Sequence, residues 1–143
     1  MNPYCGHKRD WYNDKGYHDP TAAKALASVS REQNWKPCVF ICSPFAGDVE
    51  LNTKKAVEYT KFAVEQGVIP FAPHLLYPQV LDDSNHEERE LGIFFGMVWL
   101  SKCEEIWVFG DTISSGMERE IARAEKRGLI IRYFNDKCEE VSK

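Results

Sequence analysis

The chain alternates between two hydrophobic patterns. Short runs of apolar residues, typical of strands buried on both faces, occupy 38–43, 68–73, 105–110 and 129–134. Between them, apolar residues recur at helical spacing over 49–67, 86–104 and 115–127. This alternation predicts one doubly wound α/β domain, with helices flanking a mostly parallel sheet of four to five strands.

The two ends of the chain do not follow this pattern. Residues 1–18 are polar and aromatic without a period, and Asp19-Pro20 then supplies a helix start for the alanine-rich segment that follows. We therefore predict three parts: an N-terminal tail and helical extension over 1–36, the α/β domain over 37–135, and a polar C-terminal tail over 136–143.

The net charge and the length of the apolar runs limit the kinds of partner that the protein can bind. The 143 residues carry a formal net charge of −4, which argues against a nucleic-acid polymer but allows a small phosphorylated ligand. No apolar run approaches the roughly 18 residues that span a bilayer, and the N-terminus lacks the apolar core of a signal peptide. We expect a cytoplasmic protein with no membrane partner.

The five cysteines are scattered and form no CxxC pair. Cys38, Cys42 and Cys103 lie in or beside apolar runs, so we expect reduced core residues. Cys5 and His7 offer only two potential ligands in a polar segment. We predict no metal site, and no motif indicates a cofactor.

Ligands of parallel α/β sheets bind beyond the carboxyl ends of the strands, so the segments that follow the strands are the candidate site. In the first, 43–48, Ser43 ends a strand, Pro44 turns the chain and Gly47 allows close approach of a ligand. The alternative is an ordinary turn in which Asp48 caps the next helix.

The second segment, 73–83, places His74 directly after a strand and a proline. Such a histidine is either structural or part of the site. Leu76 and Tyr77 could form an apolar wall for a flat ring, whereas Asp82 and Asp83 suit a solvated turn.

The third segment opens a helix. Ser115 and Glu118 have the spacing of a capping box, which gives Glu118 a structural role. Met117 and Ile121 form an apolar stripe that should face the sheet.

Glu120 lies on a different stripe, one turn after Gly116, where the missing side chain leaves room for a ligand. The alternative is a surface glutamate that pairs with Arg123 or Lys126. We favour Glu120 as the reactive carboxylate.

The motif Ser114-x-Gly116-x-x-x-Glu120 after a strand, together with the first loop CSPFAGD, resembles the nucleoside 2-deoxyribosyltransferase family. Close relatives in that family are 2'-deoxynucleoside 5'-monophosphate N-glycosidases and CMP hydrolases. The resemblance covers about 38–134. It implies that Glu120 is a nucleophile that attacks C1' of the sugar and forms a covalent glycosyl-enzyme.

The same resemblance implies a ligand class. Ser114 matches a serine that holds phosphate in the monophosphate hydrolases, where the transferases carry aspartate, and Ser43 matches another phosphate contact. This favours a nucleoside or nucleotide as the small-molecule partner. The predicted substrate-binding residues are Ser43, Pro44, Phe45, Gly47, His74, Ser114 and Gly116.

The chain departs from its relatives at two positions. Phe45-Ala46 stands where those hydrolases have arginine, and Gly96 stands where they carry an aspartate that assists the base or the sugar. Glu90 could replace that aspartate only with a different geometry. Three functions therefore stay open: N-glycosidic bond cleavage or base exchange, nucleotide binding without catalysis, and an interaction module that uses the aromatic N-terminal tail.

The resemblance also implies a homodimer or larger homo-oligomer. The apolar residues of 86–104 exceed what one buried face requires, which is consistent with a subunit contact.

Overall fold

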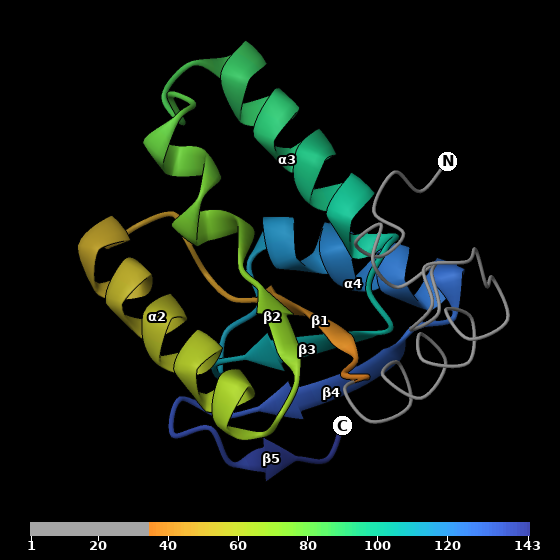
Figure 1. The fold of residues 1–143 in the computed structure, drawn as a ribbon. Coiled ribbons are helices and arrows are strands. Elements are labelled where there is room, and N and C mark those ends of the chain that lie inside the picture. The colour runs from red at the N-terminus through yellow and green to blue at the C-terminus, as the bar shows by residue number, and fades with distance from the viewer. Residues whose placement is uncertain (1–34) are drawn as a thin grey trace, which may run out of the picture. The chain divides into compact units, whose positions relative to one another are not determined.

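The computed structural model describes residues 35–143, and the predicted N-terminal helix lies outside the described residues. The described part has a five-stranded sheet in the order β2-β1-β3-β4-β5 (Figure 1). The strands are β1 (Cys38–Cys42), β2 (Ile69–Phe71), β3 (Glu105–Phe109), β4 (Ile130–Phe134) and β5 (Glu140–Val141). The helices are α2 (Val49–Glu65), α3 (His86–Leu100) and α4 (Ser115–Arg127), with short 3₁₀ turns η2 (Pro73–Leu75) and η3 (Tyr77–Gln79).

Strands β1 to β4 are parallel, which confirms the predicted fold class. In the sheet register Cys42 lies opposite Val108 on β3, so β1 and β3 end at the same edge of the sheet. Strand β5 is antiparallel to β4 and lies in the segment that we predicted to be a polar tail. Both carboxylate oxygens of Glu140 accept from Arg132 on β4, at 2.9 and 2.8 Å, which holds the two strands together.

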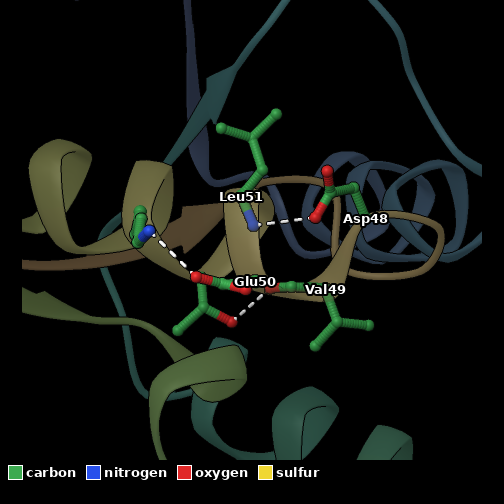
Figure 2. Close-up of polar contacts among 6 residues, drawn as sticks. Asp48, Val49, Glu50 and Leu51 are labelled. Atoms are coloured by element: carbon green, nitrogen blue, oxygen red, sulfur yellow. Dashed lines mark hydrogen bonds and ion pairs between the residues drawn. The ribbon is translucent and has the colours of Figure 1, made fainter.

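The helix starts are fixed by local side-chain caps. Asp48 accepts a hydrogen bond from the backbone N–H of Leu51 at 3.0 Å (Figure 2), so the capping alternative for Asp48 is confirmed. Helix α4 is capped by Ser114, whose Oγ accepts from Met117 N at 3.3 Å. The predicted Ser115–Glu118 capping box is wrong, because the helix begins one residue earlier than that box requires.

Helices α2 and α4 lie on opposite sides of the sheet (Figure 1), and a hydrophobic cluster lies on each side. The cluster that we name the α2 face consists of Val39, Ile41, Tyr59, Ala63, Trp107, Phe109 and Phe134. The cluster that we name the α4 face consists of Phe40, Cys42, Leu100, Ile106, Val108, Met117, Ile121 and Ala124. Strand residues alternate between the two faces, as the pleat of a strand requires, and Met117 and Ile121 face the sheet as predicted.

The outward side of α3 stays apolar and exposed within the described part of the chain. The exposed large hydrophobic residues of this helix are Leu91, Phe94, Val98 and Trp99. The subunit contact inferred from this helix stays a prediction. No helix within 35–143 combines the length and the apolarity that crossing a membrane would need.

Candidate active site

A cavity of about 140 Å³ opens where β1, β2 and β3 end. Its walls come from the segments that follow these three strands and from the inward side of α3. The position agrees with the rule for doubly wound sheets, in which the gap between β1 and β3 receives the ligand. The lining residues are Phe45, Ala46, Pro73, His74, Tyr77, Pro78, Leu81, Asp83, Glu88, Arg89, Gly92, Ile93, Gly96, Ser114, Ser115, Gly116, Met117 and Glu120.

The first wall is an aromatic pair built from two loops. Asn52 on α2 donates from its side-chain amide to the carbonyls of Phe45 and Ala46, both at 3.1 Å, and so fixes the loop after β1. The ring of Phe45 then stacks on His74, with 5.0 Å between the ring centroids and 17° between the planes. Both residues line the cavity, and aromatic rings are suited to contact with a planar ligand.

His74 is held as a neutral imidazole. Burial lowers its pKa below the usual 6.5, while the backbone of Ser43 and the charge of Asp83 act in the opposite direction. At neutral pH the ring can therefore donate one hydrogen bond and accept another, without carrying a positive charge into the cavity.

Glu120 brings a carboxylate to the cavity from the second turn of α4. The residue as a whole is half-buried, but its Oε2 atom is fully buried and has no hydrogen-bond partner within the described residues. Burial raises the pKa of Glu120 from 4.5 to about 7, and the thiol of Cys42 lowers it in part. An ionisable group with a shifted pKa in a cavity is typical of a functional site.

Cys42, the last residue of β1, carries a titratable thiol. Its side chain is fully buried on the α4 face. Burial first, and then the nearby Glu120 carboxylate, raise the pKa of the Cys42 thiol well above its usual value. The thiol is therefore protonated at neutral pH. The structure confirms the predicted reduced core cysteine at this position.

The structure brings some of the predicted substrate-binding residues together and not others. Phe45, His74, Ser114 and Gly116 line the cavity with Glu120. Three residues do not line it: Ser43, Pro44 and Gly47. Ser43 is buried, and its Oγ has no hydrogen-bond partner within 35–143.

Two other expectations for this region are corrected, and a third is extended. Glu90 does not replace the absent aspartate at Gly96, because it lies outside the cavity lining and pairs with Arg119 at 3.7 Å. Leu76 is exposed and is not part of the wall, whereas Tyr77 is. Asp83, which we assigned to a solvated turn, is exposed but reaches the cavity mouth.

Helix α3 supplies the wall that sequence reasoning missed. Glu88, Gly92 and Gly96 follow one another at i, i+4 spacing and all line the cavity. A Cβ atom at Gly92 would lie 3.4 Å from Leu81, and one at Gly96 would lie 3.9 Å from Pro73. The two glycines on one helical stripe were the signal, because they leave a groove along α3.

A second cavity of about 310 Å³ lies on the α2 side of the same sheet edge. Asp136 is an exposed residue of its lining, and it accepts a hydrogen bond from the Tyr59 hydroxyl at 3.2 Å and pairs with Lys55 at 3.4 Å. Pro44 belongs to this cavity. Its main polar groups already satisfy one another, so we assign it a structural role.

The described residues offer no metal site: no three His, Cys, Asp or Glu side chains within 35–143 come together as ligands.

Two solved structures resemble this fold. The 2-deoxyribosyltransferase from the psychrotolerant bacterium Bacillus psychrosaccharolyticus is 15% identical and has a TM-score of 0.59, and the match covers 73% of this chain and 77% of that chain. A 2-deoxyribosyltransferase from Leishmania mexicana is 14% identical with a TM-score of 0.47, over 69% of this chain and 64% of that chain. The first comparison confirms the predicted resemblance at the level of the fold.

A family profile covers most of the chain. The family described as "Domain of unknown function (DUF7768)" matches residues 37–134, and the chain belongs to this family. That range contains all four parallel strands and the whole cavity lining. No curated protein sequence matches the chain.

Proposed function

We propose that the protein binds a nucleoside or nucleotide in the first cavity and cleaves or exchanges its N-glycosidic bond. The observation that carries the proposal is the Glu120 carboxylate, which lines this cavity with a buried, unpartnered Oε2 atom. No protein donor within the described residues occupies this oxygen, so the fold does not use it in a hydrogen bond. The 2-deoxyribosyltransferase fold, with Glu120 in the predicted motif, supports the same reaction.

The binding mode follows from the walls. The base lies against the flat Phe45–His74 pair and in the groove along Gly92 and Gly96. A 5'-phosphate lies at the start of α4, where free backbone N–H groups and the Ser114 hydroxyl favour an anion. The sugar then lies between the site of the base and the site of the phosphate, next to Glu120.

The reaction has two steps. A Glu120 oxygen attacks C1' and forms an ester while the C1'–N bond breaks, and the base leaves with the electron pair and takes up a proton. Water, or the nitrogen of a second base, then attacks C1', and the ester C–O bond breaks to regenerate the carboxylate. The first acceptor gives hydrolysis and the second gives base exchange.

The protonation state of Glu120 limits the first step. With a pKa of about 7, about half of the Glu120 side chains are neutral at neutral pH in the free protein. Only the ionised form is a nucleophile. The rate should therefore rise with pH through about 7 and level off above it.

The test is base release from a panel of ribo- and deoxyribonucleosides and their 5'-monophosphates, with and without an added free base, followed by chromatography. Glu120→Ala should reduce the release by at least about 10³-fold. Glu118→Ala is the matched control, because Glu118 lies on the same helix but is exposed and outside the cavity lining. Equal release by wild type and Glu120→Ala would exclude Glu120 as the nucleophile.

A second candidate is a nucleotide-binding domain without catalysis. Gly96 favours it, because this cavity wall carries no carboxylate where the related hydrolases have an aspartate. The same panel separates the two functions. A nucleotide that raises the melting temperature of the protein without any base release would establish binding alone.

A further inference from the structure

The walls of the first cavity carry charges of both signs, and the balance is acidic. Three carboxylates line the cavity, those of Asp83, Glu88 and Glu120. Among the described residues of the lining, Arg89 on α3 is the single lysine or arginine. An anionic group of a ligand therefore depends on Arg89 for a positively charged side chain in this cavity.

The fold does not neutralise the Arg89 guanidinium within the described residues. The ion pairs among residues 35–143 do not include Arg89, although Asp83 and Glu88 line the same cavity. An oxygen of Glu88 instead accepts a hydrogen bond from the backbone N–H of Asp82. Arg89 is exposed, so it keeps its charge at the solvent-facing side of the lining without a partner from this part of the chain.

An ion pair between two helices sets the position of Arg89 relative to α4. Glu90, the next residue on α3, pairs with Arg119 of α4 at 3.7 Å, and the two helices contact each other. Arg119 lies one turn after Ser115 and Gly116, which line the cavity at the start of α4. The ion pair therefore keeps this part of α3, and Arg89 with it, close to the first turns of α4.

Arg89 and the start of α4 together suit a phosphate group. A phosphate monoester carries nearly two negative charges at neutral pH, and a planar guanidinium can bind two of its oxygens with parallel hydrogen bonds. The first turn of α4 adds backbone N–H groups and the positive end of the helix dipole. The carboxylates of the other walls repel such a ligand, so the interaction with Arg89 decides whether the cavity accepts it. An unphosphorylated nucleoside has no group that needs this charge.

We propose that Arg89 determines the substrate specificity of the first cavity: together with the first turn of α4, its guanidinium binds the 5'-phosphate of a nucleoside monophosphate and so selects nucleotides over unphosphorylated nucleosides. This inference rests on the proposed function for the class of ligand, and it adds the choice between the two kinds of substrate. The phosphate takes no part in bond breaking at C1'. Arg89 therefore acts on the affinity for substrate and not on the chemical step.

The first test measures binding and needs no turnover. Glu120→Gln, which lacks the nucleophile, is titrated calorimetrically with ribo- and deoxyribonucleoside 5'-monophosphates and with the matching nucleosides. The monophosphates should bind at least about 10-fold more tightly than the nucleosides. Adding Arg89→Ala should weaken monophosphate binding about 10- to 100-fold, because a charge-assisted contact is lost, and should change nucleoside binding by less than about twofold.

Arg127→Ala is the matched control, because it removes the same charge from an exposed position in the last turn of α4, outside the cavity lining. It should leave both affinities unchanged. Arg89→Lys keeps the charge but loses the planar group, so it should recover part of the lost affinity. Since Arg89 is exposed and alanine favours a helix, Arg89→Ala should fold, and thermal unfolding without ligand checks this. An equal loss for monophosphates and nucleosides, or no loss for either, would overturn the proposal.

The second test separates this role from the proposed reaction. With Glu120 present, Arg89→Ala should raise the KM of the monophosphates by about 10-fold or more, while kcat stays within about threefold and the KM of the nucleosides is unchanged. Base release that does not distinguish monophosphates from nucleosides would contradict the role of Arg89 and leave the proposed reaction standing. Binding of monophosphates that depends on Arg89, without base release, would exclude the reaction and leave the role of Arg89 standing. If no member of the panel binds or reacts, both proposals fail.

Discussion

The two sides of the sheet differ in whether their buried polar groups have hydrogen-bond partners. Around the α2 face, buried and half-buried polar groups have partners: the Tyr59 hydroxyl donates to Asp136, and the Trp107 indole N–H donates to Glu105 at 2.7 Å. Three buried polar atoms within the described residues lack a partner, and they are Ser43 Oγ, Glu120 Oε2 and Arg123 Nε. Two of them are on α4 and the third is at the end of β1.

This difference separates stability from function. Paired polar groups stabilise the fold, whereas an unpaired buried carboxylate destabilises it. A protein retains such a group where a ligand or a reaction needs it. The paired groups around the α2 face therefore contribute to stability, whereas α4 carries the unpaired carboxylate on which the proposed function rests.

The largest expected effect that tests this comparison is the pH dependence of Glu120→Gln. The pKa of Glu120 is about 7 in the folded protein and near 4.5 when exposed, so the folded state binds this proton more tightly. The stability from this group is fully present below about pH 4.5 and is lost as the pH rises through about 7. Glutamine does not titrate. The free energy of unfolding of Glu120→Gln should therefore be about 2–3 kcal/mol higher than that of wild type at about pH 8, and the difference should be much smaller at about pH 5.

Urea unfolding of both proteins at the two pH values measures this difference. Glu118→Gln, on the exposed side of α4, should show no such dependence. A stability difference between Glu120→Gln and wild type that is the same at both pH values would mean that the carboxylate is not strained in the folded state.

A smaller effect of the opposite sign is expected on the α2 face. Tyr59→Phe removes the hydroxyl that donates to Asp136 and keeps the ring that stacks on Phe109 at 4.4 Å. We expect the free energy of unfolding, measured in urea at neutral pH, to fall by about 1 kcal/mol, because one partly buried hydrogen bond is lost. Tyr133→Phe is the control, since the Tyr133 hydroxyl has no hydrogen-bond partner among residues 35–143. A more stable Tyr59→Phe protein would remove the contrast between the faces.

The smallest effect concerns the groove along α3. Gly96→Ala should stabilise the protein by about 0.5–1 kcal/mol, because glycine is unfavourable within a helix and the new Cβ would meet Pro73 at an ordinary contact distance of 3.9 Å. Gly47→Ala is the opposite case, since its φ of +98° strains any residue with a Cβ. Thermal unfolding compares both with wild type. A destabilised Gly96→Ala would show that the groove is needed for packing and not for a ligand.

The sequence predicted the elements because burial leaves a period in it. The apolar runs at 38–43 and 105–110 and the Met117–Ile121 stripe were sufficient to predict the strands, the helix and its buried side. Asp48 was recognisable as a cap from its place before a helix. The cap of α4 was misplaced by one residue, since Ser114 and Ser115 are equally suitable by type and only the backbone geometry separates them.

Part of the candidate site was also predictable, namely the residues that follow the ends of strands. Phe45, His74, Ser114 and Glu120 were expected near one another because parallel strands end at one edge of a sheet. Ser43 and Gly47 were expected there as well, but they do not line the cavity. The rule identifies the loop and does not say which of its residues point inward.

The sequence by itself thus predicted the order of the four parallel strands and of helices α2, α3 and α4, together with the cap of α2. It also selected Glu120 as the candidate carboxylate. Only the tertiary structure decided that Gly92 and Gly96 line a wall of the cavity and that burial raises the pKa of Glu120 to about 7. The reason is physical. A periodic pattern records how each residue faces its own element, whereas a pKa and a cavity depend on atoms contributed by several elements at once.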